Sequence, residues 1–319
     1  MSFSSDLKFE LSQIDNKDCC AAAEAYGLML FGRSFSRDEI SIMTEHDSVA
    51  QRYSEAVALI INKAPLVKRS ASGKITVLVN DKNDCLKILN FFGYSANELK
   101  LRLNMGAISE SCCCKAFLRG AFMSCGTVTD PEKEYHLEFS VLGKSLAYDF
   151  KKYFEICEAC LDENQELNEE GDEVVNLIQS RSISPGLTQR KGAYVLYFKD
   201  SSSIEDVLTL MGAVSSSMTL MGVKVLKDIR NNVNRKMNFD GANINRSVEA
   251  NLKQNKAVKK IERTIGLNSL SPDLQHIARL RLDNPEMTLK ELSEATEGRL
   301  TRSAVSYRLN KLIEIAEKI

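Results

Sequence analysis

The stretch CCCKAFLRGAFMSCGTV, residues 112 to 128, decides the fold because an earlier stretch repeats its landmarks. Residues 19 to 35, CCAAAEAYGLMLFGRSF, align with it at a constant offset of 93 residues. The matched pairs are Cys19/Cys112, Cys20/Cys113, Ala23/Ala116 and Gly27/Gly120. Such self-similarity indicates two copies of one structural unit.

A second pair of segments extends the repeat. GKITVLVNDKNDCLKILNFFG (73 to 93) aligns with GAYVLYFKDSSSIEDVLTLMG (192 to 212), now at an offset of 119. The matched pairs are Gly73/Gly192, Asp81/Asp200, Leu89/Leu208 and Gly93/Gly212. The second copy is therefore 26 residues longer, and we expect the insertion at 161 to 173, an exposed loop with seven acidic residues.

Each copy is predicted to hold a glycine-bearing helix, an alternating strand, a helix, a second strand and a closing helix. The strands are expected at 40–43 and 75–79 in the first copy, and at 136–141 and 194–198 in the second. Glycine inside a helix costs about 1 kcal/mol relative to alanine. Gly27 and Gly120 therefore indicate two helices whose backbones approach closely on a pseudo-twofold axis.

Composition sets the broad class. The chain has 319 residues, of which 44% are hydrophobic and 27% charged, and this excludes disordered and fibrous proteins. With no signal-like amino terminus and no apolar run of about 18 residues, we expect a cytosolic protein of two domains without a membrane segment. The nine cysteines, odd in number and partly adjacent, are expected to be reduced and buried.

One cysteine motif remains open at this level. Cys157 and Cys160 form a lone CxxC in a helix-like run, which is compatible with half of a zinc site, a redox pair or two structural thiols. A second ligand pair at suitable spacing is missing, which favours the structural thiols. Walker, GxGxxG and GxSxG motifs are also missing, so no metal or cofactor is predicted.

Charge is distributed unevenly along the chain. Residues 221–319 hold 19 basic and 12 acidic residues, a net charge of +7, whereas residues 1–220 carry −8. The basic excess is concentrated between Lys224 and Arg263. We interpret 221–266 as a basic linker segment, expected to be helical, which either contacts a polyanion or is a solvated basic helix. Residues that could contact DNA or a neighbouring domain are Arg230, Asn234, Arg235 and Asn238.

The last segment, 267–319, is predicted to form three short helices. Ser271 and Pro272 begin the first, and Thr288 with Glu291 forms a capping box for the second. Gly298 marks the turn before the third helix, which starts near Thr301. The side chains expected to point inward are Leu274, Ile277, Ala278, Leu289, Leu292, Ala295, Val305, Leu309 and Leu312.

The exposed face of the third helix is polar and basic, whereas the helix before it carries three acids. This pattern is typical of a helix-turn-helix whose last helix enters the major groove of double-stranded DNA. The alternative is an ordinary helical bundle with a charged surface. The candidate DNA-binding residues are Arg299, Arg302, Ser303, Ser306, Tyr307, Arg308, Asn310 and Lys311.

The duplicated glycine-bearing helix resembles the LAGLIDADG homing endonucleases, with LRGAFMSCG (118 to 126) over the family signature. In those nucleases, an acidic residue occupies the eighth signature position of each copy, and the two carboxylates hold divalent metal ions. Here Gly32 and Cys125 occupy these positions, and neither provides a carboxylate. We therefore expect no catalytic residues.

With the terminal helix-turn-helix, the whole chain resembles the WhiA family of bacterial proteins. The most specific segments are CCKAFLRGAFMSCGTVTDPEKEYHLEFS (113 to 140), RNNVNRKMNFDGANINRSV (230 to 248) and SPDLQHIARLRLDNPEMTLKELSE (271 to 294). The fold class implied is α+β: a duplicated LAGLIDADG-like domain over 1–220, with repeats of about 1–104 and 105–220, followed by an all-α helix-turn-helix domain over 267–319.

The function implied is a non-enzymatic, sequence-specific DNA-binding protein. It would regulate transcription in cell division and chromosome segregation, or in sporulation in some relatives, at the nucleoid in the cytoplasm. The acidic domain 1–220 is expected to contact a protein partner or a second copy of the chain. A residual metal-dependent endonuclease and a protein-binding scaffold remain the alternatives.

Overall fold

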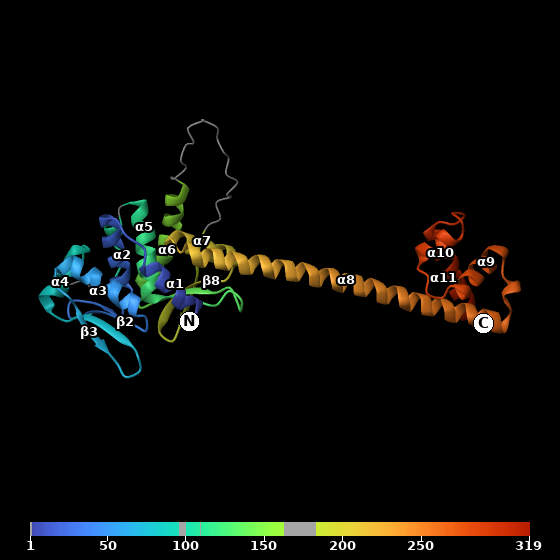
Figure 1. Ribbon diagram of the computed structural model, residues 1–319, viewed down its shortest axis with the longest axis horizontal. Helices are drawn as coiled ribbons and strands as arrows, with labels where there is room; N and C mark the ends of the chain where they lie inside the picture. The colour runs from blue at the N-terminus through green and yellow to red at the C-terminus, as the bar shows by residue number, and fades with distance from the viewer. Residues whose placement is uncertain (1, 96–99, 109, 163–182) are drawn as a thin grey trace, which may run out of the picture. The chain divides into compact units, whose positions relative to one another are not determined.

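The computed structural model describes residues 2–95, 100–108, 110–162 and 183–319, apart from the side chains of 111 and 155–162. The chain divides into two compact units, Met1–Leu226 and Lys227–Ile319, here called unit 1 and unit 2 (Figure 1). Within the described residues, none of the helices combines the length and the apolar character needed to cross a membrane.

Unit 1 contains the two predicted copies, with the elements in the same order. The first consists of α2 (Asp18–Leu30), β1 (Ser34–Phe35), β2 (Ile40–Thr44), α3 (Asp47–Ile61), β3 (Leu66–Arg69), β4 (Ile75–Val79) and α4 (Lys82–Phe91). A short 3-10 helix, Met105–Ala107, precedes the second copy. That copy consists of α5 (Ser111–Cys125), β5 (Gly126–Val128), β6 (Leu137–Val141), α6 (Lys144–Asp162), β7 (Gly186–Arg190), β8 (Ala193–Phe198) and α7 (Ser201–Met211).

Each copy forms one four-stranded antiparallel sheet, in the orders β1-β2-β4-β3 and β5-β6-β8-β7. The predicted strands are the two central ones in each sheet, where Ile42 pairs with Val77 and Phe139 with Leu196. The outer strands were not predicted. In β3 all four side chains are exposed and β1 has only two residues, so neither carries the alternation that identifies a half-buried strand.

The aligned landmarks have the same structural role in both copies. Asp81 and Asp200 cap the amino termini of α4 and α7, each accepting a hydrogen bond from a backbone N–H of the first turn. Gly93 and Gly212 follow the ends of the same helices with φ of 76° and 84°, which glycine adopts without strain. The internal repeat is therefore confirmed.

The added length of the second copy lies between α6 and β7. In the first copy α3 ends at Ile61 and β3 begins at Leu66, whereas α6 ends at Asp162 and β7 begins at Gly186. The acidic stretch 161–173 falls in this interval, but from residue 163 onward it lies outside the described residues.

Helices α2 and α5 pack against each other at the centre of unit 1, and their backbones touch (Figure 1). A Cβ atom added to Gly27 would lie 2.3 Å from the Phe117 carbonyl oxygen, and one added to Gly120 would lie 2.2 Å from the Glu24 carbonyl oxygen. Both distances are far below van der Waals contact. The prediction of closely approaching glycine-bearing helices is confirmed.

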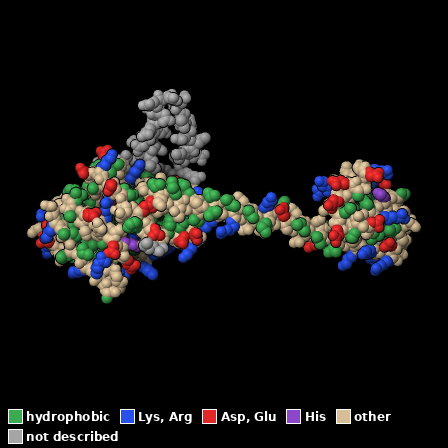
Figure 2. All heavy atoms as spheres, viewed as in Figure 1, with side chains coloured by type: hydrophobic (Ala, Val, Ile, Leu, Met, Phe, Trp, Pro, Cys, Tyr) green, Lys and Arg blue, Asp and Glu red, His purple; other side chains and the backbone are tan. Residues whose placement is uncertain are grey.

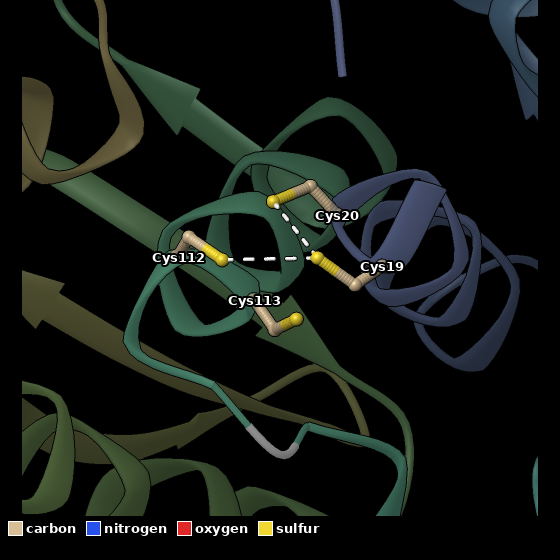
Figure 3. A group of neighbouring side chains, drawn as sticks. All are labelled: Cys19, Cys20, Cys112 and Cys113. Carbon is tan, nitrogen blue, oxygen red and sulfur yellow. Dashed lines mark hydrogen bonds between the residues drawn. The ribbon is translucent and has the colours of Figure 1, made fainter. Parts of the chain in front are cut away.

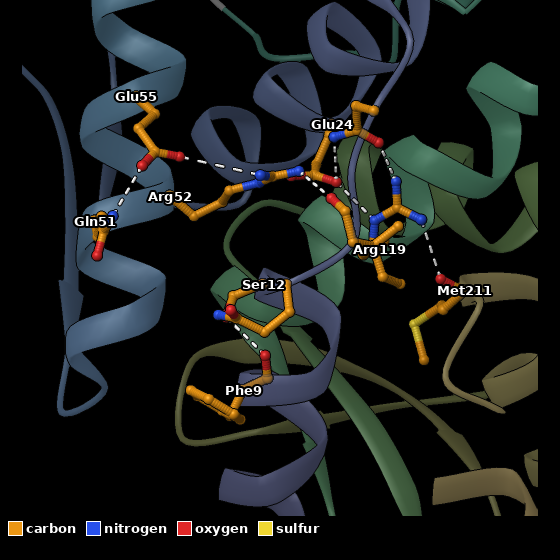
Figure 4. Close-up of polar contacts among 11 residues, drawn as sticks. Phe9, Ser12, Glu24, Gln51, Arg52, Glu55, Arg119 and Met211 are labelled. Carbon is orange, nitrogen blue, oxygen red and sulfur yellow. Dashed lines mark hydrogen bonds and ion pairs between the residues drawn. The ribbon is translucent and has the colours of Figure 1, made fainter. Parts of the chain in front are cut away.

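A buried carboxylate joins three helices beside this contact (Figure 4). Glu24 of α2 accepts hydrogen bonds from Nε of Arg119 in α5 and from Nε of Arg52 in α3, each at 2.6 Å. Asn16 donates to the same carboxylate at 2.8 Å, and Arg119 also donates to the Met211 carbonyl at 3.1 Å. The sequence analysis did not identify this network, because its members share no motif or spacing.

An amino-terminal helix, α1 (Phe3–Ser12), was also not predicted. Its Glu10 carboxylate accepts hydrogen bonds from the backbone N–H groups of Ser215 at 2.7 Å and Ser216 at 3.0 Å. These groups belong to the first turn of α8 (Val214–Thr264), a single helix of 51 residues. The expected linker 221–266 is therefore helical through Thr264, and its helix already begins at Val214.

Unit 2 packs the end of α8 with three further helices, α9 (Pro272–Asp283), α10 (Leu289–Ala295) and α11 (Arg302–Lys318), after a 3-10 turn at Leu267–Ser269. The core includes Leu274, Ile277, Leu292, Val305, Leu309 and Leu312, as expected, together with Ala257, Val258 and Ile261 of α8. The end of α8 is thus a fourth helix of this core. One expectation is wrong: Ala295 is exposed and Thr296 is buried in its place.

We predict that Gly27→Ala lowers the free energy of unfolding by about 1–3 kcal/mol, because the added methyl group must separate α2 from α5. Chemical denaturation of the full chain measures the effect. Gly222→Ala is the control, since a Cβ atom at that position of α8 would meet no atom within 4 Å. Alanine there should be neutral or stabilising by up to about 1 kcal/mol. Equal effects of the two substitutions would contradict the tight contact.

Candidate nucleic-acid interface

Helix α10 and the turn that connects it to α11 are built as the sequence predicts. The Thr288 hydroxyl accepts from the Glu291 backbone N–H at 3.3 Å, and the Glu291 carboxylate accepts from the Thr288 N–H at 2.7 Å, completing the capping box. Gly298 has φ of 77°, and the Thr301 hydroxyl accepts from the Ala304 N–H at 3.3 Å. These contacts fix where α11 begins and therefore which residues it exposes.

Helix α11 has two distinct faces. Val305, Leu309 and Leu312 are fully buried against α8, α9 and α10. On the other side, five of the predicted residues line one surface pocket together with Leu289 of α10: Arg302, Ser303, Ser306, Tyr307 and Asn310. Tyr307 is a large side chain with 66% of its surface exposed. The structure thus brings these five side chains together on one polar surface.

The other basic candidates differ in their surroundings. The Arg308 guanidinium donates to the Asp273 carboxylate of α9 at 3.1 Å, and only 21% of its side chain is exposed. Arg299 lies in the turn and forms an exposed ion pair with Glu297 at 3.6 Å. Lys311 is exposed on α11. Arg308 is therefore engaged within unit 2, whereas Arg302 and Lys311 extend the polar surface.

The four secondary candidates, Arg230, Asn234, Arg235 and Asn238, are all exposed on α8. The same part of α8 also exposes large apolar side chains, which the sequence analysis did not single out (Figure 2). These are Val225, Leu226, Ile229, Val233, Met237, Phe239, Ile244, Val248 and Leu252. Exposed α8 therefore has mixed apolar and basic character, which a charge count alone does not reveal.

The two positions expected to hold catalytic carboxylates lie at the ends of the central helices. Cys125 is the last residue of α5, and Gly32 follows α2. A Cβ atom at Gly32 would lie 2.6 Å from the Ser41 carbonyl oxygen, so a larger side chain does not fit there. Desolvation raises the pKa of the Cys125 thiol to about 12, which keeps it uncharged at neutral pH.

A buried lysine near Cys125 further disfavours metal binding at this position. Lys8 of α1 is only 8% exposed, and burial lowers the pKa of its amine, with the nearby Cys125 thiol acting in the opposite direction. Its Nζ also lies 5.9 Å from the centre of the Phe122 ring. An ammonium beside a neutral thiol does not favour a divalent cation. The other cysteine candidates, Cys157 and Cys160, lie on α6 but their side chains are outside the described ones.

Comparison with protein families matches both parts of the chain. The WhiA LAGLIDADG-like domain family matches residues 114–160 and 160–230, and the WhiA C-terminal HTH domain family matches residues 233–316. These matches agree with the duplicated αβ fold of unit 1 and with the helical fold of unit 2.

Whole-chain relatives give the same result. The chain is 35% identical to the probable cell division protein WhiA of Ruminiclostridium cellulolyticum and 32% identical to that of Bacillus licheniformis. Both alignments cover 100% of this chain, and 98% and 97% of the relatives. Among solved structures, full-length WhiA from Thermatoga maritima matches with a TM-score of 0.54 at 21% identity, covering 100% of this chain and 99% of that one.

We predict that Lys8→Met stabilises the protein at pH 7 by about 1 kcal/mol, because it removes a charge from an apolar site while keeping the packing. Since the folded-state pKa of Lys8 lies below its ordinary value of 10.5, the native state binds fewer protons than the unfolded state between these two values. Wild-type stability should therefore rise relative to the variant as the pH approaches 10.5.

Chemical denaturation of both proteins at pH 7 and near pH 10 measures this difference. Lys82→Met is the matched control, because the Lys82 side chain is 65% exposed on α4. It should change the free energy of unfolding by less than about 0.5 kcal/mol at either pH. A Lys8→Met protein less stable than wild type at pH 7 would show that the ammonium is favourably placed.

Proposed function

The chain belongs to the WhiA family, and we propose that it is a double-stranded DNA-binding protein that acts by occupying DNA, without catalysis. The observation that supports this most is the polar, basic face of α11, which lies opposite a fully apolar face in a compact helix-turn-helix. A helix of this kind, presented after a capped short helix and a glycine turn, suits the major groove of DNA.

The roles of individual residues follow from their chemistry. Ser303, Ser306, Tyr307 and Asn310 carry hydrogen-bonding groups that can read base edges. Arg302 and Lys311 flank them and can neutralise phosphates, with Arg299 available at the turn. We expect Arg308 to contribute less to DNA binding, since DNA would have to compete with Asp273 for its guanidinium.

We further propose that this DNA binding is sequence-specific and controls transcription in cell division and chromosome segregation, with sporulation control in some relatives. The support is that relatives at 32–35% identity over nearly their full length are named probable cell division proteins, together with the hydrogen-bonding side chains on the exposed face of α11. On this proposal the protein acts at the nucleoid in the cytoplasm.

For the duplicated domain we propose contact with a protein partner or with a second copy of the chain. Residues 1–220 carry a net charge of −8, which disfavours binding to a polyanion such as DNA. The exposed basic residues of α8, Arg230 and Arg235 with the neighbouring Asn234 and Asn238, provide a secondary DNA contact or an interdomain contact. Duplex binding by a 1–220 fragment as tight as that of the full chain would contradict this division of roles.

We predict that Arg302→Ala and Lys311→Ala each weaken binding of the full chain to a mixed-sequence duplex about tenfold at low salt. Each should also lower the slope of log K against log salt concentration by about 0.9, because one phosphate contact is lost. Fluorescence anisotropy with labelled duplex across a salt series measures both quantities. Asn310→Ala should instead reduce the preference between duplexes of different sequence.

Lys318→Ala is the matched control. Lys318 is an exposed lysine of the same helix, but it lies about 24 Å along α11 from Arg302. It should leave both the affinity and the salt slope within error. If all three charge deletions have the same effect, the interaction is nonspecific attraction to the net charge of unit 2, and the proposed groove-reading face is wrong.

We predict that the full chain does not nick or linearise supercoiled plasmid in the presence of Mg²⁺ or Mn²⁺, because Gly32 and Cys125 replace both metal-binding carboxylates. Gel electrophoresis of plasmid incubated with excess protein gives the readout. Metal-dependent cleavage that stays with the protein through a further purification step would support the residual-nuclease alternative. Cleavage that separates from the protein would indicate a contaminating nuclease.

A further inference from the structure

Four cysteine side chains converge where the first turns of α2 and α5 meet (Figure 3). Cys19 and Cys20 come from α2, and Cys112 and Cys113 come from α5. All four Sγ atoms lie within 4.8 Å of one another. The Cys19 sulfur is 3.8 Å from that of Cys112 and 3.9 Å from that of Cys20.

These spacings fit a single tetrahedral metal ion. In a four-cysteine zinc site the Zn–S bonds are about 2.3 Å, so neighbouring sulfurs are about 3.8 Å apart. A disulfide needs an S–S distance of about 2.05 Å, far shorter than either measured distance. A cluster of several iron ions would space its thiolates more widely, because they bind different irons.

Two opposing effects act on the thiols. Burial raises the pKa of Cys20 to about 12 and that of Cys113 to about 11, so a metal ion has to displace their protons, whereas the helix termini favour the thiolate form. The four cysteines are the second and third residues of their helices, where the helix dipole is positive and thiolates are stabilised. The capping residues, Lys17 and Glu110, make no side-chain hydrogen bond to these first turns. Backbone N–H groups there remain available to sulfur, within the described part of the chain.

Burial and access are both suitable for a structural site. Cys20 and Cys113 are 8% and 2% exposed, so the packed core holds two of the sulfurs in place. Cys19 is exposed and Cys112 is partly exposed, which leaves a path for a metal ion from solvent. The expectation that the cysteines are buried is therefore wrong for Cys19, and this exposure is what makes the cluster reachable.

We propose that Cys19, Cys20, Cys112 and Cys113 bind one Zn²⁺ ion that links the two repeats at the first turns of their central helices. Thiolate sulfur is a soft ligand that selects zinc over magnesium or calcium. The site lies in unit 1, so it is independent of the proposed DNA-binding face on α11. The ligands come as adjacent pairs rather than as CxxC motifs, which is why the motif search did not find the site.

The first test is the metal content of the full chain, purified under reducing conditions and measured by mass spectrometry of the elements. We expect about one zinc per chain. Replacement of zinc by Co²⁺ should produce the visible absorption bands of a tetrahedral cobalt site, with a thiolate-to-cobalt charge-transfer band in the near ultraviolet. Cobalt spectra report the ligands directly and do not depend on any activity of the protein.

The second test is the double variant Cys19→Ser with Cys112→Ser, which changes the two more exposed ligands and spares the core. It should retain less than about a tenth of a zinc ion per chain and lose the cobalt bands. Cys114→Ala is the matched control, because Cys114 follows Cys113 in the same helix but is outside the cluster. It should keep both the zinc and the cobalt spectrum.

Thermal unfolding separates metal loss from misfolding. A chelator should lower the melting temperature of wild type and of Cys114→Ala but not that of the double variant, because only a bound ion stabilises by mass action. If the double variant does not fold, the cobalt spectrum of wild type decides.

Four outcomes would overturn the proposal. They are a wild type that takes up neither zinc nor cobalt when reduced, zinc fully retained in the double variant, bound iron with sulfide, and a cobalt spectrum without thiolate charge transfer.

Discussion

Backbone contact between α2 and α5 at Gly27 and Gly120 is the constraint on which the rest of unit 1 depends. Because a Cβ at either position would lie about 2 Å from a carbonyl oxygen of the other helix, only glycine permits this approach. With the helices so close, each sheet can pack around the same central pair, and residues from the two repeats meet across the axis. The Glu24–Arg119 ion pair is one consequence of that proximity, and the four converging cysteines are another.

The Glu24 network explains how this contact is restricted to one register. Burying a carboxylate costs several kcal/mol of desolvation, so its pairing with Arg119 and Arg52 adds little net stability. A shift of α5 along α2 by one turn would, however, leave the buried charge unpaired. Alternative packings of two similar small-residue helices are thereby disfavoured, and the native register is selected by the penalty on the others.

Features that depend on the local sequence could be predicted, whereas features that depend on tertiary contacts could not. Gly27 and Gly120 predicted the close helices, and Thr288, Glu291 and Gly298 predicted the turn that presents α11, because glycine and capping residues act on their own backbone. Helix α1 and the Glu24 network were missed, since their partners are distant in sequence. Strand β3 pairs with the neighbouring β4, but it was missed because all its side chains are exposed and show no apolar alternation. The same reasoning explains the candidate site: the helical period of α11 identified its exposed face, but only the structure showed that Arg308 is paired with Asp273.

The lack of carboxylates at positions 32 and 125 also affects which of the two units is expected to bind DNA. A divalent cation bridging the LAGLIDADG-like helices would offset the repulsion between DNA phosphates and an acidic domain, but Cys125 and Lys8 leave no carboxylate pair to hold one there. A domain with a net charge of −8 and no such cation gains little from a polyanion. On the proposed function, affinity for DNA comes from residues beyond 220, where the basic excess and the polar face of α11 are found. The central helices keep their packing role, because the glycine contact that joins them does not require the catalytic carboxylates.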